Sequence, residues 1–164
     1  MGVATSGMIL NLAYQLTEDS SYLETSRSNL HYLLGSNAVG ECFVTGYGTV
    51  SPEHPHHRPS MAKNQAMKGM LVGGVNSGLE DSAAKAYCAN SPAAKCYVDN
   101  WESYSTNEIT IYWNSPLTCL LAMSGKHSAD TPEEDILPGD VNLDKAVNTA
   151  DIVLLQKYLL GETT

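Results

Sequence analysis

Residues 97–115 read YVDNWESYSTNEITIYWNS and place two carboxylates, Asp99 and Glu108, among aromatic rings and side-chain amides. Cleavage of a glycosidic bond needs one carboxylic acid that protonates the leaving oxygen and a second carboxylate that activates water or attacks the sugar. The apolar and aromatic residues that follow Glu108 favour its protonated form, which suits the acid. This stretch therefore predicts a sugar site with Glu108 as the general acid.

A second interpretation of the same stretch stays open. Residues 105–108, Ser-Thr-Asn-Glu, also match a capping box, in which a glutamate side chain reaches back to the first amide of a helix. The predicted helix runs over residues 107–123, and Pro116 either kinks it or marks a fresh start with Ser115 as cap. In this interpretation Asp99 is a solvated loop carboxylate.

Helical periodicity precedes this stretch in the first part of the chain. Apolar residues recur at helical spacing over residues 8–16 and again over residues 22–34. Ser21 and Glu24 match a capping box for the second run, and Gly35 is expected just past its end. The two helices form a hairpin whose apolar faces need further helices, so the sequence predicts an all-α fold.

Residues 36–76 break this periodicity with Gly, Pro, Asn and His, and a short helix is expected over residues 81–87. Unperiodic loops of this length are usually functional. Residues 54–60 contain three histidines and Arg58. A zinc site on one short loop lacks the usual spread of ligands, whereas guanidinium and imidazole groups bind sugar hydroxyls and carboxylates well. A plain surface loop is the alternative.

Two separated groups of residues form one pattern when they are taken together. They are Val44-Thr45-Gly46-Tyr47-Gly48 with Pro55-His56-x-Arg58, and then Tyr97-x-Asp99, Tyr104, Glu108, Thr110 and Asn114-Ser115. The pattern resembles the carboxy-terminal half of a family 9 glycoside hydrolase, an inverting cellulase, over about residues 3–124. The resemblance implies part of an (α/α)6 barrel with endo-β-1,4-glucanase activity on cellulose. The site residues it implies are Glu108, Asp99 and His56 for catalysis, and Arg58, His57, Tyr47, Tyr104 and Trp113 for substrate binding.

The resemblance also implies that one catalytic group lies elsewhere. In the family, the base that activates water comes from an Asp-rich motif far toward the amino terminus, and this chain contains no such motif. An inverting enzyme separates its two carboxyl groups by ~6.5–9.5 Å, and Asp99 does not serve as the base in the family. We therefore expect a catalytic fragment with little or no turnover, poorly folded alone because apolar helix faces stay uncovered.

A calcium-loop pattern lies near the end of the chain, in residues 140–151. Positions 1, 3, 5, 9 and 12 of the loop hold side-chain oxygens and position 7 offers a carbonyl, as in an EF-hand. The predicted Ca²⁺ ligands are Asp140, Asn142, Asp144, Ala146, Asn148 and Asp151. Position 6, where glycine permits the sharp turn, is Lys145. A helix is expected over residues 152–161, and a disordered acidic tail is the alternative.

This loop and helix resemble the first repeat of a dockerin, the module that binds a cohesin on a scaffolding protein. The partner-facing positions that the resemblance implies are Thr149, Ala150, Gln156 and Lys157. Cellulase, linker and dockerin is the order of cellulosomal enzymes, which implies an extracellular protein. The expected organisation is a hydrolase part over residues 1–126, a linker over 127–136 and a partial dockerin over 137–164.

The composition argues against two classes of partner. Nine basic and eighteen acidic side chains give a net charge of −9, so a nucleic acid partner is not expected. No apolar run approaches the ~20 residues of a membrane span, and the first residues lack the pattern of a signal peptide. Cys88 and Cys96 flank a short loop, and either pair in an oxidising compartment or stay buried thiols.

Two other function classes stay open. A calcium-dependent interaction module would use its hydrolase-like part only for packing or for binding glucan. A carbohydrate-binding protein would use aromatic side chains as stacking platforms, and the candidates are Tyr47, Trp101, Tyr104 and Trp113. Cohesin binding without glucan cleavage would favour the first class. Binding that survives Glu108→Gln but not Trp101→Ala would favour the second.

Overall fold

The computed structural model describes residues 2–129, 139, 141–142, 144 and 146–159. The chain divides into two compact units, Met1–Gly125 and Lys126–Thr164. The regular elements of the described residues are all helices, and these residues add three isolated β-bridges but no strand. The predicted all-α class is therefore confirmed for the described part of the chain.

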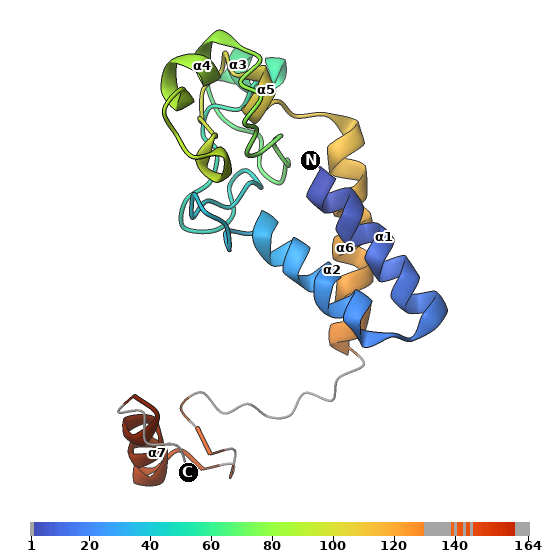
Figure 1. Cartoon of the computed structure of the whole chain (residues 1–164), viewed down its shortest axis with the longest axis vertical. Coiled ribbons are helices and arrows are strands. Elements are labelled where there is room, and N and C mark those ends of the chain that lie inside the picture. Colours follow the sequence, from blue (N-terminus) through green and yellow to red (C-terminus); the bar gives the residue numbers. More distant parts are fainter. Residues whose placement is uncertain (1, 130–138, 140, 143, 145, 160–164) are drawn as a thin grey trace. The chain divides into compact units, whose positions relative to one another are not determined.

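Three helices form what we call the helical arm: α1 (Gly2–Thr17), α2 (Ser20–Leu33) and α6 (Ile111–Ala129). Figure 1 shows α1 and α2 as an antiparallel pair with α6 beside them. The helices predicted over residues 8–16 and 22–34 are thus confirmed, and α1 begins well before its apolar stripe.

The three helices of the arm meet at Gly7. A Cβ atom at this position would lie 2.8 Å from Cδ2 of Leu120 on α6 and 3.3 Å from Cβ of Asn29 on α2. The hydroxyl of Ser26 on α2 also donates to the Gly7 carbonyl at 2.8 Å. A glycine here lets the helices approach closely, and interior packing of this kind leaves no room for an added methyl group.

The first turn of α2 has a different cap from the predicted one. Asp19 is the N-cap residue, and its side chain accepts a hydrogen bond from the Ser21 N–H at 2.9 Å. The predicted capping box of Ser21 and Glu24 is therefore wrong. An aspartate just before the helix satisfies the same orphan amide, so the two arrangements compete in the sequence.

The last turn of α2 ends as predicted. Gly35 follows the C-cap residue and has a φ of 125°, where residues with a side chain are strained. The Ser36 N–H donates to the His31 carbonyl at 2.9 Å, and the Gly35 N–H donates to the Tyr32 carbonyl at 3.4 Å. These two bonds form a Schellman motif, which satisfies carbonyls that the helix leaves unpaired.

Residues 34–110, the loop region, are mostly irregular and gather at one end of the helical arm (Figure 1). They contain short helices only. These are α3 (Arg58–Lys63), α4 (Ser82–Cys88), the 3-10 turn η1 (Ala93–Lys95) and α5 (Tyr104–Asn107). The short helix predicted over residues 81–87 is α4, one residue along.

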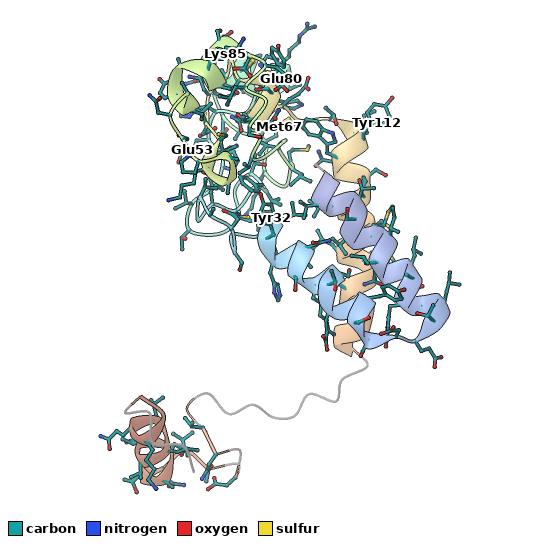
Figure 2. The ribbon with its side chains drawn as sticks, in the orientation of Figure 1. Tyr32, Glu53, Met67, Glu80, Lys85 and Tyr112 are labelled. Carbon is teal, nitrogen blue, oxygen red and sulfur yellow. The ribbon has the colours of Figure 1, made fainter. Side chains whose placement is uncertain are left out.

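The core joins the arm to the loop region. Its buried residues are Ala4, Leu33, Cys42, Phe43, Val44, Leu71, Val72 and Leu117. The ring of Phe43 lies 5.1 Å from that of Tyr97 and 5.9 Å from that of Tyr32, centroid to centroid. Figure 2 shows Tyr32 at the end of α2, next to the loops. Aromatic contacts thus fasten the loop region to the end of the arm.

The predicted helix over residues 107–123 is wrong at its start. Residues 108–110 separate α5 from α6, and Glu108 has φ −71° and ψ 147°, an extended conformation. Pro116 lies inside α6, so a fresh helix start at Ser115 is also wrong. The segment carrying the candidate acid is therefore not helical.

The helical arm leaves large apolar side chains exposed. Leu16 on α1 is 87% exposed, and Ile111 and Tyr112 at the start of α6 are 79% and 82% exposed. Figure 2 shows Tyr112 pointing away from the molecule. The expectation that apolar helix faces would stay uncovered is met at these positions.

The described part of the second unit contains the last residues of α6 and the helix α7 (Thr149–Leu159), which starts three residues before the predicted helix. The exposed apolar side chains of this unit include Val147, Ile152 and Leu155. Of the predicted linker, residues 127–129 continue α6, and the rest lies outside the described residues. No described helix combines the length and apolar character that a membrane span requires.

Candidate active site

The backbone of Glu108 is fixed by its neighbours in space. The Gly73 N–H donates to the Glu108 carbonyl at 3.0 Å, and Gly74 N–H donates to the Thr106 carbonyl at 2.7 Å. Glu108 also pairs with His56 in a parallel bridge. Because α5 has Ser103 as its N-cap and ends before Glu108, the capping-box interpretation is wrong.

A cavity of about 740 Å³ opens beside this segment. Glu108, Tyr104 and Trp113 all line it, so the structure brings three of the predicted site residues together. Tyr104 is 47% exposed, and its hydroxyl donates to the Glu80 carbonyl at 3.0 Å. A carboxyl group and two aromatic rings that line one cavity have the composition of a sugar site.

Asp99 is not a solvated carboxylate. Its oxygens accept hydrogen bonds from the backbone N–H of Glu53 and of His54, at 2.8 and 2.9 Å. They also accept from the Asn107 side-chain amide at 2.8 Å and lie 3.2 Å from Nδ1 of His54. Asp99 therefore holds the turn that leads into His56, and it does not line the cavity with Glu108.

Asn107, directly before Glu108, connects three loops and was missed by sequence reasoning. It is fully buried, and its amide donates to the His54 carbonyl at 2.7 Å and to Asp99. Its side-chain oxygen accepts from the Tyr97 hydroxyl at 2.7 Å. Its backbone carbonyl accepts from the His56 N–H at 2.9 Å. The position next to Glu108 was the only signal for this role in the sequence.

The three histidines have different partners. Nδ1 of His56 bonds to the Trp101 carbonyl, so Nδ1 carries the proton and Nε2 is the acceptor nitrogen. His57 is the N-cap of α3, and its Nδ1 lies 2.9 Å from the Ser60 hydroxyl. His54 is the partner of Asp99 described above. Within the described residues no three His, Cys, Asp or Glu side chains gather as a metal site.

Arg58 and Tyr47 lie on the surface. Arg58 is the first residue of α3, is exposed, and forms no ion pair with another described residue. Tyr47 is 51% exposed, and Nζ of Lys68 lies 4.7 Å from the centre of its ring. Lys68 thus covers one ring face with a cation–π contact, which leaves the other face for a ligand.

A second hollow of about 370 Å³ lies beside this surface. Trp101, His54 and Gly46 contribute to its lining, and none of them lines the cavity of Glu108. The rings of His54 and Trp101 meet edge to face with their centroids 5.3 Å apart. Of the candidate stacking residues, Trp101 therefore lies at this second hollow, whereas Tyr104 and Trp113 line the cavity of Glu108.

A buried carboxylate, Asp81, fastens the loop before Glu108. It is 5% exposed, and it accepts from the Ala84 N–H at 2.6 Å and from the Ser105 N–H at 2.8 Å. The hydroxyls of Ser103 and Ser105 donate to the same carboxylate. Burial alone would raise the pKa of Asp81, but these hydrogen bonds outweigh it and lower the pKa.

Two further ionisable side chains, Glu41 and Tyr97, interact electrostatically with Asp99. Burial raises the pKa of Glu41 to about 7, and the negative charge of Asp99 raises it further in the same direction. Burial likewise raises the pKa of the Tyr97 hydroxyl, with smaller contributions from Glu41 and Asp99. Tyr97 therefore stays neutral and acts as the donor to Asn107.

The order of these residues along the chain is that of a known family. Residues 1–121 match the sequence profile of glycosyl hydrolase family 9. The chain belongs to glycosyl hydrolase family 9. The family 9 resemblance of the sequence is thereby confirmed over the hydrolase part of the chain.

Curated family 9 relatives extend the comparison. A cellulose 1,4-β-cellobiosidase of Acetivibrio thermocellus is 36% identical over 166 residues, which cover 93% of this chain and 18% of that protein. A xyloglucan-specific endo-β-1,4-glucanase of Bacteroides ovatus is 45% identical over 116 residues, which cover 70% of this chain and 19% of that protein. The chain thus spans about a fifth of the length of these relatives.

Solved structures of family 9 enzymes share the fold. A single mutant of the thermostable endoglucanase from Alicyclobacillus acidocaldarius has a TM-score of 0.61 at 40% identity, over 71% of this chain and 24% of its own. Another family 9 endoglucanase has a TM-score of 0.66 at 36% identity, over 71% of this chain and 22% of its own. The arm and loop region therefore form part of a family 9 fold, in agreement with part of an (α/α)6 barrel.

The predicted calcium loop lies in the second unit. Asp151 is 2% exposed, and its carboxylate accepts from the N–H groups of Val141, Asn142 and Asn148 at 2.7, 3.2 and 2.8 Å. These backbone hydrogen bonds lower the pKa of Asp151, and the bond from the Asn148 N–H has the largest effect. Asp151 thus closes the loop onto the first turn of α7.

The other predicted ligands face their own backbone. The side chains of Asn142, Asp144 and Asn148 each accept from the N–H two residues further on, at 3.1, 2.9 and 2.8 Å. Ala146 offers its carbonyl, which accepts from the Asn148 amide at 3.2 Å. Asp140 lies outside the described residues. The described donors are all oxygens, the ligand type that suits Ca²⁺.

Proposed function

We propose that this chain carries the acid-bearing part of a β-1,4-glucan hydrolase, with Glu108 as the general acid. The observation that carries the proposal is the cavity that Glu108 shares with Tyr104 and Trp113. The two curated relatives are described as a 1,4-β-cellobiosidase and an endo-β-1,4-glucanase, so a β-1,4-linked glucan such as cellulose is the common substrate class.

The chemistry follows from these positions. A sugar ring stacks on Tyr104 or Trp113, and Glu108 protonates the glycosidic oxygen as the bond to the anomeric carbon breaks. Nε2 of His56 contacts a sugar hydroxyl or the acid, because Nδ1 is held by Trp101. Asp99 positions His56 through its bonds to the preceding turn. Arg58, His57 and Tyr47 offer further contacts to a bound glucan.

The base that activates water is proposed to lie outside these residues. Inversion needs a second carboxylate at ~6.5–9.5 Å from the acid, with room for a water molecule between them. Asp99 does not meet this need, because its oxygens already accept four hydrogen bonds or close contacts. The 164-residue chain alone should therefore show little turnover.

Release of reducing ends from amorphous cellulose tests this function. The chain alone should stay near background, and addition of the amino-terminal part of a family 9 domain should restore release. Restored release should disappear in Glu108→Gln, which keeps the size of the side chain but cannot donate the proton. Glu108-dependent release by the chain alone would contradict the missing base. Equal restored release by Glu108→Gln would contradict the role of the acid.

We also propose that the second unit is a dockerin-like module that binds Ca²⁺ and a cohesin, outside the cell. The cellobiosidase alignment covers 93% of the chain, so it must extend beyond the first unit, which ends at Gly125 of 164 residues. Asn142, Asp144, Asn148 and Asp151 would hold the ion together with the Ala146 carbonyl and Asp140. Bound calcium would neutralise the acidic loop and fix α7 against it.

Calcium titration by calorimetry tests the second proposal. One binding event should be seen for the chain, and it should be lost in Asp144→Ala. A recombinant cohesin should be retained in calcium and released by chelator. Absence of calcium-dependent heat would contradict the site, and retention of cohesin without glucan cleavage by the complemented protein would favour an interaction module over an enzyme.

A further inference from the structure

A second carboxylate, Glu80, lines the same cavity as Glu108, and neither the family pattern nor the proposed mechanism uses it. Glu80 is exposed and lies in the loop that precedes α4. Figure 2 shows it among the loops and short helices, away from α1 and α2. Glu80 therefore places a second acidic residue on the wall of the cavity.

The carboxylate of Glu80 is held in place before any ligand arrives. Oε2 accepts a hydrogen bond from the side-chain amide of Asn76 at 2.8 Å. The same amide donates to the Ser105 carbonyl at 3.1 Å, and the oxygen of Asn76 accepts from the Gly78 N–H at 2.9 Å. Asn76 therefore uses both ends of its amide to fix Glu80 against the loop that carries Tyr104.

Gly78 makes room for the other carboxylate oxygen. A Cβ atom at this position would overlap with Oε1 of Glu80. The backbone of Gly78 has no positive φ, so the space for Glu80 is what distinguishes glycine from alanine here. A methyl group at residue 78 would displace the carboxylate without changing its charge.

The negative charge of Glu80 has no counter-ion among the described residues. No Lys, Arg or His among the described residues forms an ion pair with it. The hydrogen bond from Asn76 occupies Oε2 and leaves further lone pairs of the carboxylate open. An ordered, unpaired carboxylate on a cavity wall thus keeps acceptor capacity for a ligand.

Tyr104 stands beside this carboxylate. Its hydroxyl donates to the backbone carbonyl of Glu80, so the aromatic ring is tied to the residue that carries the carboxylate. Sugar hydroxyls donate strong, charge-assisted hydrogen bonds to carboxylates while the apolar sugar face stacks on an aromatic ring. Both features of such recognition are present at neighbouring positions.

We propose that Glu80 is a substrate-binding residue, whose carboxylate accepts hydrogen bonds from the hydroxyls of a β-1,4-glucan unit stacked on Tyr104. The inference rests on the proposed function, because it names a further contact for the same substrate. It adds a specificity determinant: a glucan whose hydroxyls at this unit are substituted would lose the contact.

Cellopentaose binding, measured by isothermal titration calorimetry on the 164-residue chain, tests the inference. Glu80→Gln should weaken binding by about tenfold, the loss expected for hydrogen bonds to a charged group. Gly78→Ala should weaken it to a similar extent, although its charge is unchanged. The backbone carbonyl that holds Tyr104 remains in both variants. Glu24→Gln, an exposed glutamate on α2, gives the same change of net charge and should bind like the parent chain.

Circular dichroism first confirms that each variant keeps its helix content. Four outcomes then decide whether Glu80 binds the substrate. Weaker binding by both Glu80→Gln and Gly78→Ala, with normal binding by Glu24→Gln, supports the inference. Normal binding by Glu80→Gln overturns it and leaves the proposed function in place. Equal weakening by Glu24→Gln also overturns it, because the effect would then come from net charge. No binding of cellopentaose by the parent chain overturns both the inference and the proposed function.

Discussion

The helical arm and the loop region share an apolar core, but the backbone of the loop region is also held by buried polar side chains. In the arm, buried apolar residues such as Leu120 and Leu33 make the contacts, because helices satisfy their own backbone groups. The loop region has few regular elements, and its buried residues include Asn107, Asp81 and Thr106. Irregular backbone needs side-chain partners for its N–H and C=O groups, so here buried polar side chains add to the apolar packing of residues such as Phe43 and Leu71.

The largest effect is expected at Asn107, because its side chain joins three loops. Asn107→Ala should lower the free energy of unfolding by about 3 kcal/mol or more, since it leaves several buried partners unsatisfied. Equilibrium unfolding in urea measures the change. Asn100→Ala removes one local hydrogen bond to Glu102 and should cost less than about 1 kcal/mol. Equal costs for both variants would mean that Asn107 does not hold the loop region.

Asp81→Asn should cost about 2 kcal/mol at pH 7, because an amide in place of the carboxylate cannot accept from all of its donors. The folded-state pKa of Asp81 is lowered. Its stabilising contribution is therefore present above the unfolded pKa of about 3.9 and is lost as pH falls through the folded value. The difference between parent and variant should shrink below about pH 4 in urea unfolding curves. A difference that stays constant down to pH 2 would contradict the role of the ionised carboxylate.

In the helical arm, Gly7→Ala should destabilise by about 1 kcal/mol. The new methyl group meets Leu120 and Asn29, and this cost exceeds the gain in helix propensity. Gly125→Ala on α6 is the matched control, because a Cβ there has nothing within 4 Å. The control should be stabilised slightly in a thermal unfolding experiment. Stabilisation of both variants would contradict close packing of the arm at Gly7.

The smallest effect on stability is expected for a substitution of Glu41, and this effect depends on pH. Its pKa is raised to about 7 by burial, then by Asp99. The neutral form therefore fits the fold, and stability is complete below the unfolded pKa and falls as pH rises through about 7. Glu41→Gln mimics the neutral form and should stabilise by on the order of 1 kcal/mol at pH 8, with allowance for its partial exposure. At pH 4 the melting temperatures of variant and parent should agree, and a gain that persists there would contradict this account.

Periodicity predicted the helices of the arm but not the connections of the loop region. The stripes over residues 8–16 and 22–34 identified α1 and α2, because each helix buries one face. The bonds between Asp99 and residues 53–54, or between Asp81 and Ser105, join segments far apart in the sequence. No local spacing encodes such pairs, which is why Asn107 and Asp81 were missed.

The start of α6 shows the limit of local rules. Residues 105–108 match a capping box, yet α5 ends before Glu108, and the bonds of Thr106 to Gly74 and of Glu108 to Gly73 hold Glu108 in an extended conformation. Tertiary hydrogen bonds outweighed a cap that contributes about 1 kcal/mol. Glu108, Tyr104 and Trp113 could be named from the family pattern. Glu80 could not, because its role depends on a cavity that only the fold creates.

The backbone hydrogen bonds that hold Glu108 indicate which positions protein engineering can vary. The acid is positioned by its own backbone, through Gly73 and the bridge to His56, and not by the side chains that surround the cavity. Libraries that randomise the cavity wall at positions 80, 104 and 113 can therefore explore new sugar preferences while the proton donor keeps its place. Residues 73 and 74 should be left constant in such libraries, since a Cβ at Gly73 would lie only 3.0 Å from the Thr106 carbonyl oxygen, two residues before the acid.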